Sequence, residues 1–200
     1  MQEEGYIKFQ SHWEVGEALP AAAIAQLNAC RAVLYQQGLI GAYADGIGYG
    51  NVSERLPDGQ FLITGSATGR LPVLDGRHFS RVTAVAEEAN ALWCVGPVAA
   101  SSESMSHAAV YACCPEARMV VHVHSLALWE RLLRQVPATP ATAAYGTPEM
   151  AAAIRELFRT TAVARLRIFA MEGHREGLFT FGEDMASALA PLEAALGHRF

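Results

Sequence analysis

The apolar and polar positions of this chain follow two periods, one typical of helices and one typical of strands. Between Pro20 and Gln37, apolar side chains recur every three or four residues, at Ile24, Leu27, Cys30 and Leu34. This spacing places them on one face of a helix, and the following Gly38 suits the left-handed residue that ends many helices. The pattern therefore predicts a helix over residues 20–37.

Two short strand-like runs follow this helix, at Asn51–Leu56 and Gln60–Thr64. The segment that separates them is Pro57-Asp58-Gly59, and each of these three residue types favours a turn. Two such runs joined by a short turn predict a β-hairpin.

The rest of the chain predicts helices and strands in mixed order. Helices are expected at residues 83–92, 107–114 and 125–134, from Thr147-Pro148-Glu149 onwards, and at 183–196 with a break at Pro191. Strands are expected at residues 93–100, 118–124, 165–171 and 178–181. Because the strands arrive as hairpins, we expect an α/β fold of the α+β type, with a central mixed, largely antiparallel β-sheet sandwiched by helices. No repeat or linker interrupts this order, so residues 1–200 are expected to form a single domain.

Composition excludes several classes of protein. The 200 residues are 52% apolar and 18% charged, which argues against a disordered chain. The formal net charge of −5 argues against nucleic-acid binding, which needs a basic face. No run approaches the roughly 18–20 apolar residues of a membrane span, and residues 1–10 show no export signal. We therefore expect a cytoplasmic protein with no nucleic-acid or membrane partner.

The segment Val121-His122-Val123-His124 is the most informative part of the chain for chemistry. In a strand, His122 and His124 point to the same face, roughly 6.5 Å apart, while the two valines point to the other. Two such imidazoles can reach one metal ion, and a catalytic zinc site adds a third protein ligand. His174, in a turn between two expected strands, is the candidate for that ligand. The two histidines would equally fit a polar sheet face without a metal.

Glu103 and two small polar loops are the other candidate features. Ser101-Ser102-Glu103 opens an expected helix, where it fits ordinary capping, anion binding by backbone N–H groups or acid–base chemistry. The loops at residues 48–53 and 64–69 are rich in Gly, Asn, Ser and Thr, which allow close approach to a ligand and supply neutral donors. As isolated segments, both loops also fit plain turns.

Five motifs in one order resemble the class II aldolase/adducin family. They are Gly50-Asn51-Val52-Ser53, Ile63-Thr64-Gly65-Ser66, Ser101-Ser102-Glu103 with His107, His122-Val123-His124-Ser125 with the later His174, and Tyr145-Gly146-Thr147-Pro148-Glu149. The resemblance covers most of the chain, from the helix at Pro20 to the last helix. One departure follows the third histidine, where Arg175 and Glu176 stand before Gly177 in place of a directly following glycine.

The resemblance implies a metal-dependent, aldolase-type carbon–carbon lyase that cleaves a small hydroxy-ketone or sugar phosphate through a metal-stabilised enediolate. It implies that His122, His124 and His174 bind a divalent metal, most often zinc, with manganese, cobalt or iron as alternatives. Glu103 would shuttle a proton, and Tyr145 is the candidate second proton donor. The residues implied to hold a phosphate are Gly50, Asn51, Thr64, Gly65, Ser101 and Ser102.

Other members of this family differ in their reaction or have none. The same metal site would serve an epimerase, a dehydratase or a hydroxy-acid decarboxylase, and an adducin-like member would be a non-catalytic interaction domain. The Glu at position 103 and the three retained histidines favour the lyase. The resemblance also implies a homotetramer.

Overall fold

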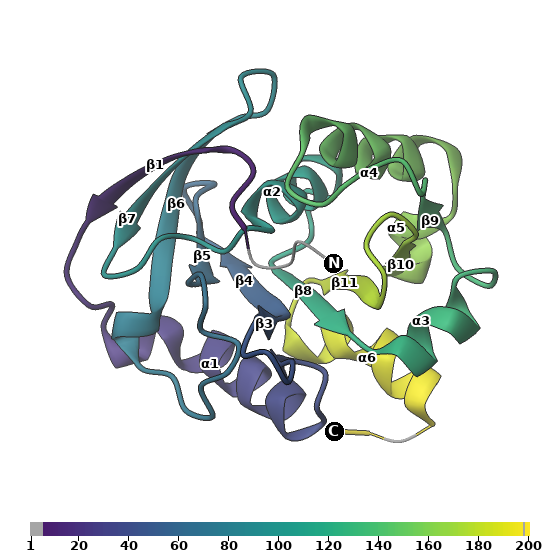
Figure 1. The fold of residues 1–200 in the computed structure, drawn as a ribbon, viewed down its shortest axis with the longest axis horizontal. Helices are drawn as coiled ribbons and strands as arrows, with labels where there is room; N and C mark the ends of the chain where they lie inside the picture. The colour runs from purple at the N-terminus through teal and green to yellow at the C-terminus, as the bar shows by residue number, and fades with distance from the viewer. Residues whose placement is uncertain (1–5, 198) are drawn as a thin grey trace.

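The computed structural model describes residues 6–197 and 199–200, which form one large sheet with helices on both faces (Figure 1). The sheet order is β1-β7-β6-β5-β4-β8-β11-β10-β9. Its strands are β1 (Gln10–Val15), β4 (Asn51–Arg55), β5 (Phe61–Thr64), β6 (Phe79–Ala86), β7 (Ala91–Gly96), β8 (Met119–His124), β9 (Ala138–Thr139), β10 (Ile168–Met171) and β11 (Gly177–Gly182). A separate small ribbon pairs β2 (Gly41–Ala42) with β3 (Gly48–Tyr49).

The pairing within the large sheet is mixed and largely antiparallel. Only the two edge pairs, β1 with β7 and β10 with β9, are parallel among the described strands. All pairs between them are antiparallel, including the hairpin formed by β4 and β5. The expected fold class and the expected hairpin are therefore confirmed.

Helices cover the sheet from both sides and enclose two apolar cores. The helices of the described chain are α1 (Ala21–Gln36), α2 (Ser104–Cys113), α3 (Leu126–Leu132), α4 (Pro148–Thr160), α5 (Val163–Leu166), α6 (Met185–Leu196) and the 3-10 turn η1 (Gly76–His78). Side chains of α2 and α4 pack on one face of the sheet, and those of α1, α3 and α6 pack on the other. In Figure 1, α2 and α4 lie above the sheet, and α1 and α6 lie below it.

Strand β8 shows how sequence alternation positions the site. Val121 and Val123 point into the core between the sheet and helices α1 and α6, so His122 and His124 point to the face that carries α2. All four side chains are buried because β8 lies in the middle of the sheet, between β4 and β11. The expected orientation of the two histidines is confirmed by this register.

One predicted helix is wrong. The segment 83–92 forms the end of β6, a turn and the start of β7. Its Ala and Glu residues favour a helix locally, but residues 84–86 pair with residues 91–93 across β6 and β7, and Leu92 is buried in the core. Tertiary pairing thus outweighs a weak local preference, and Asn90 turns the chain with a positive φ of 46°.

Other element boundaries also differ from expectation. The strand expected from Arg165 begins only at Ile168, because α5 and the left-handed Arg167 precede it. Helix α6 continues through Pro191 without the expected break. Leu189 and Leu192, on either side of that proline, are both buried against the sheet and hold the two halves in line. The edge strands β1 and β9 were not predicted.

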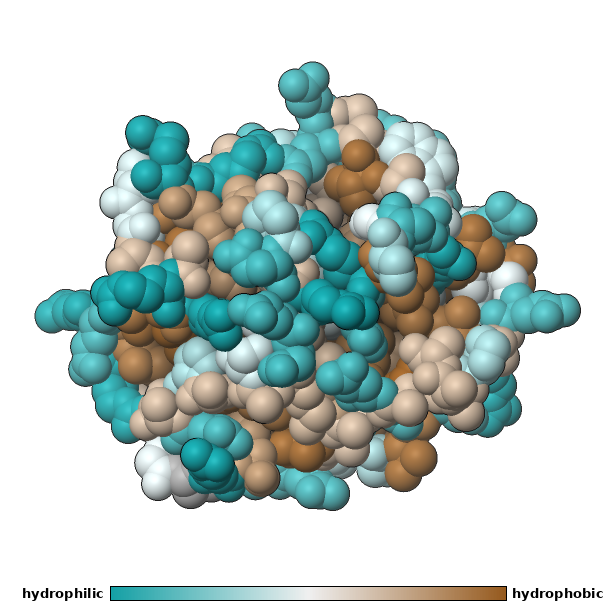
Figure 2. Space-filling model, turned by 180° about the vertical axis from the view of Figure 1, so that it is seen from behind, coloured by the Kyte–Doolittle hydropathy of each residue, from teal (hydrophilic) through white to brown (hydrophobic). Residues whose placement is uncertain are grey.

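The surface mixes polar and apolar residues. Figure 2 shows polar residues across the centre of the face seen from behind, with apolar residues towards its margins. The largest exposed apolar side chains of the described residues are Tyr6, Trp13, Val15, Val73 and Trp93. Among the described helices, none is both long and apolar enough to cross a membrane.

Candidate metal centre

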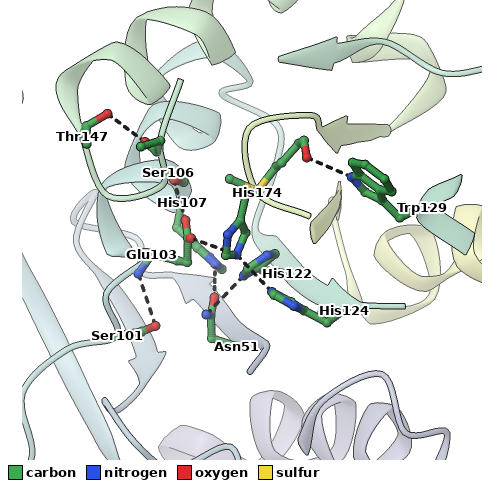
Figure 3. Close-up of polar contacts among 12 residues, drawn as sticks. Asn51, Ser101, Glu103, Ser106, His107, His122, His124, Trp129, Thr147 and His174 are labelled. Atoms are coloured by element: carbon green, nitrogen blue, oxygen red, sulfur yellow. Dashed lines mark hydrogen bonds and ion pairs between the residues drawn. The ribbon is translucent and has the colours of Figure 1, made fainter. Parts of the chain in front are cut away.

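Three histidines, two from one strand and one from a distant turn, converge on one point, as Figure 3 shows. His122 and His124 lie on β8, and His174 lies in the turn between β10 and β11. One ring nitrogen from each lies within 4.8 Å of the others, and the Nε2 atoms of His124 and His174 are 3.1 Å apart. The sheet therefore brings together the three residues that the sequence nominated as metal ligands.

The histidine cluster is chemically suited to a metal ion. Burial holds the pKa values of His122 and His124 well below the usual 6.5, and neighbouring histidines lower them further. Both rings are therefore neutral near pH 7, as metal ligands must be. The buried Nε2 of His122 has no hydrogen-bond partner among the described residues. A polar atom buried in this way without a partner is costly unless something binds it.

Gly177 leaves the space that this cluster needs. A Cβ atom at this position would lie 3.2 Å from His122 Nε2 and 2.7 Å from His174 Cδ2. Gly177 pairs with His124 across β8 and β11 and borders the rings of His122 and His174. The residues present therefore fit a divalent cation held by three imidazoles.

Glu103 lies beside the cluster and is also buried. Its Oε1 lies 3.7 Å from His174 Nε2, and Ser106 Oγ donates a hydrogen bond of 2.7 Å to its Oε2 (Figure 3). Glu103 occupies the position before α2, but its side chain makes no capping hydrogen bond there. Its carboxylate is thus directed towards the histidines, and its own backbone N–H donates a 3.4 Å hydrogen bond to Ser101 Oγ.

A buried polar chain runs from the cluster into the core. Asn51 lies between two rings, with Oδ1 2.6 Å from His107 Nε2 and Nδ2 3.4 Å from His122 Nδ1. Ser53 Oγ lies 2.6 Å from His107 Nδ1 and 2.8 Å from the hydroxyl of Tyr111. Burial lowers the pKa of His107 to about 3 and raises that of Tyr111. The sequence places His107 only in a family motif and indicates no role for Ser53 or Tyr111.

A cavity of about 220 Å³ opens beside the histidines. The nominated residues that line it are Gly50, Asn51, Gly65, Ser101, Ser102, Glu103, His122, Tyr145 and His174. Thr64 does not line it, because its hydroxyl is turned into the sheet and accepts a 3.3 Å hydrogen bond from Val52 N. Ser66, Ala67 and Thr68, in the same loop, do line it. The sequence did not nominate these three residues individually for ligand binding, but the polar composition of their loop indicated that the loop could line a ligand site.

Position 50 requires a glycine, because of its backbone conformation and because neighbouring atoms leave no space for a side chain. Its φ is 76°, in the region that favours glycine. A Cβ there would lie 2.7 Å from Ile40 Cγ1 and 3.2 Å from the backbone oxygen of His122. The loop can therefore approach β8 closely and turn Asn51 towards His122.

Tyr145 is buried at the same cavity. Its ring centroid lies 4.7 Å from that of His174, and Lys8 Nζ lies 4.1 Å from its ring centroid. The segment that carries Tyr145 thus packs between the N-terminal segment and the histidine cluster.

Comparison with known proteins agrees with this geometry. The family model described as Class II Aldolase and Adducin N-terminal domain matches residues 25–195. No curated protein sequence matches the chain significantly.

Three of the similar solved structures illustrate the likeness, and at below 25% identity each shows the fold alone. The sugar-phosphate aldolase from Thermotoga maritima has a TM-score of 0.66 at 19% identity, over 87% of this chain and 90% of that one. An L-fuculose 1-phosphate aldolase has a TM-score of 0.65 at 14% identity, over 90% of this chain and 84% of that one. YgbL from Escherichia coli, described as a candidate aldolase/epimerase/decarboxylase, has a TM-score of 0.64 at 23% identity, over 86% and 84%. Since the family model covers most of the chain, as the motifs had indicated, this protein belongs to the class II aldolase and adducin N-terminal domain family.

Proposed function

We propose that this protein is a metal-dependent lyase of the aldolase type that cleaves a small hydroxy-ketone or sugar phosphate. The observation that carries the proposal is the buried Glu103 carboxylate, 3.7 Å from His174 at the wall of the cavity. Cleavage beside a carbonyl needs a group that moves a proton and a centre that stabilises negative charge. The carboxylate and the histidine cluster supply sites for both.

We propose zinc as the ion of this site. Three imidazole nitrogens are a common donor set for catalytic zinc, although manganese, cobalt and iron also accept imidazole. When bound, the ion would act as a Lewis acid towards the carbonyl oxygen of the substrate. His122, His124 and His174 are the residues proposed to hold it.

Glu103 is proposed to accept and return the proton. Ser106 holds one carboxylate oxygen by a 2.7 Å hydrogen bond, which leaves the other oxygen on the side of His174. Burial excludes water from this carboxylate, since only 3% of Glu103 is exposed. Tyr145, whose ring contacts His174, is proposed as the second proton donor.

The loops around the cavity are proposed to bind the anionic end of the substrate. Gly50, Asn51, Gly65, Ser101 and Ser102 all line the cavity. The buried Arg31 supports the loop that follows Gly65. Its guanidinium donates hydrogen bonds to the backbone oxygens of Thr68, Gly69 and Pro72. We propose a phosphorylated small molecule as the substrate.

Metal content tests the proposed site directly. Protein purified without chelators is expected to contain about one divalent metal per chain. His122→Ala should weaken metal binding by on the order of a hundredfold or more, because partners behind a ligand alone contribute 10–100-fold. His12→Ala, on the exposed strand β1, is the matched control and should retain the metal. A metal-free wild-type protein would contradict the proposal.

Product analysis tests the proposed reaction. The metal-loaded protein would be incubated with a panel of ketose and aldonate phosphates, and the products separated by mass and stereochemistry. Release of a smaller aldehyde is the expected result. Epimerised, dehydrated or decarboxylated products would instead assign one of the other reactions, and no turnover of any member would favour a non-catalytic domain.

We also propose that the chain assembles as a homotetramer. All six residues of the edge strand β1 are exposed, and they include Trp13 and Val15. An exposed edge strand with apolar side chains is a surface that proteins usually cover. Light scattering should give a mass about four times the 21.5 kDa of one chain. A mass equal to that of one chain would contradict this assembly.

A further inference from the structure

The second nitrogen of His124 is held by a tyrosine, which in turn bonds a carboxylate, and the mechanism proposed above uses neither group. The hydroxyl of Tyr43 lies 2.8 Å from His124 Nδ1 and donates a 3.0 Å hydrogen bond to Glu176 Oε2. These residues lie far apart in the sequence and meet only because β2, β8 and the turn after β10 converge.

The direction of the hydrogen bonds in this group follows from the number of protons available. An ionised carboxylate only accepts hydrogen bonds, and a tyrosine hydroxyl has a single proton. Because that proton lies on the side of Glu176, the Tyr43 oxygen must accept at His124 Nδ1. The ring proton of a neutral His124 is then on Nδ1, and Nε2 carries the lone pair.

We propose that Tyr43 and Glu176 are positioning residues that fix the tautomer of His124 so that its Nε2 is presented to the metal. His124 Nε2 is the atom that lies 3.1 Å from His174 Nε2 in the histidine cluster. Outer hydrogen-bond partners of metal-binding histidines serve this purpose in many metal sites. The inference rests on the proposed metal site and is independent of the reaction proposed there.

The backbone at Glu176 supports a role for its side chain. Its φ is 76°, a conformation that glycine adopts without strain and that costs other residues free energy. Glu176 also accepts a backbone hydrogen bond of 3.1 Å from Ser125 N, the residue after His124. The turn that carries His174 is thus tied to the end of β8 by both the backbone and the side chain of Glu176.

Tyr43 also connects His124 to the rim of the cavity. Its backbone N–H donates to Ile47 O at 2.9 Å, and its ring centroid lies 4.7 Å from that of Tyr49. Ile47 and Tyr49 both line the cavity. The same loop therefore shapes the cavity and orients a metal ligand.

Zinc affinity of the purified full-length chain, measured by competition with a chromophoric chelator, tests the proposal. Tyr43→Phe keeps the ring but removes the hydroxyl, and it should weaken zinc binding by about 10–100-fold. Tyr35→Phe, which removes a hydroxyl bonded to Arg70 O on the exposed side of α1, should bind zinc as the wild type does. Equal affinity in Tyr43→Phe and the wild type would overturn the proposal.

Glu176→Gly separates positioning from structural support. Glycine relieves the positive φ, so the variant should be as stable as the wild type or more so, yet it should bind zinc about 10–100-fold more weakly. A loss of zinc affinity that only accompanies unfolding would assign Glu176 a structural role and overturn the proposal. Glu172→Gln, an exposed change in the same turn, is the control.

Nitrogen-15 NMR of the metal-free wild type reads the tautomer directly. The proton of His124 is expected on Nδ1 in the wild type and is expected to redistribute towards Nε2 in Tyr43→Phe. A wild-type proton on Nε2 would overturn the proposal even if both variants failed to fold. A wild type that binds no zinc but carries its proton on Nδ1 would contradict the proposed function and leave the tautomer assignment standing.

Discussion

Replacement of Glu103 by glutamine is expected to lower turnover by about 10²–10⁴-fold, the usual contribution of general acid–base catalysis. Glutamine keeps the size of the side chain and an acceptor for Ser106 Oγ, which bonds the Glu103 carboxylate at 2.7 Å. It cannot accept the proton that the proposed cleavage transfers. Metal should remain bound, because the three histidines supply the proposed ligand set.

Two further measurements make this prediction specific. The free energy of unfolding should change little, since Glu103 makes no capping hydrogen bond to α2. Glu88→Gln, an exposed change in the turn between β6 and β7, should leave turnover intact. If Glu103→Gln kept full activity but lost more than about 2 kcal/mol of stability, the carboxylate would have only a structural role.

Acid is expected to destabilise the metal-free protein in the range where histidines ordinarily titrate. His107, His122 and His124 all have pKa values lowered by burial, that of His107 to about 3. Below about pH 6.5 the unfolded chain therefore binds protons that the folded chain does not. The contribution of these neutral histidines to the free energy of unfolding is therefore complete above about pH 6.5. As the pH falls below that value, the free energy of unfolding decreases by about 1.4 kcal/mol per pH unit for each such histidine.

Urea unfolding of the metal-free protein at several pH values measures this loss. The free energy of unfolding should be level between about pH 7 and 8 and decline steeply between about pH 6.5 and 5, above the range of ordinary carboxylates. His107→Gln removes one of the three groups and should flatten the decline by about 1.4 kcal/mol per pH unit. A free energy that stays constant from pH 6.5 to 5 would show that these rings accept protons in the folded state.

The local sequence pattern was sufficient to predict the structure wherever the spacing of apolar, polar and turn-forming residues decides it. Alternation along β8 predicted that His122 and His124 share a face, because side chains of a strand alternate by geometry alone. The hairpin of β4 and β5 was predicted from its turn residues. Family membership was predicted from the order of short motifs, each of them weak alone.

Local pattern failed where pairing or packing with distant residues decides the structure. Residues 83–92 favour a helix by composition, but the pairing of residues 84–86 with 91–93 across β6 and β7, together with burial of Leu92, makes strands of both ends. The edge strand β1 has no buried face that its sequence could reveal, since all six of its residues are exposed.

The sequence by itself determined which side chains are candidates for chemistry, and the tertiary structure decided how they are oriented. Residue types and spacing nominated His122, His124, His174 and Glu103, because few side chains can bind a metal or move a proton. The Tyr43–Glu176 pair behind His124 and the Asn51–His107 chain behind His122 could not be inferred from spacing. Hydrogen bonds act over about 3 Å, and only the folded sheet brings residues from separate elements within that distance.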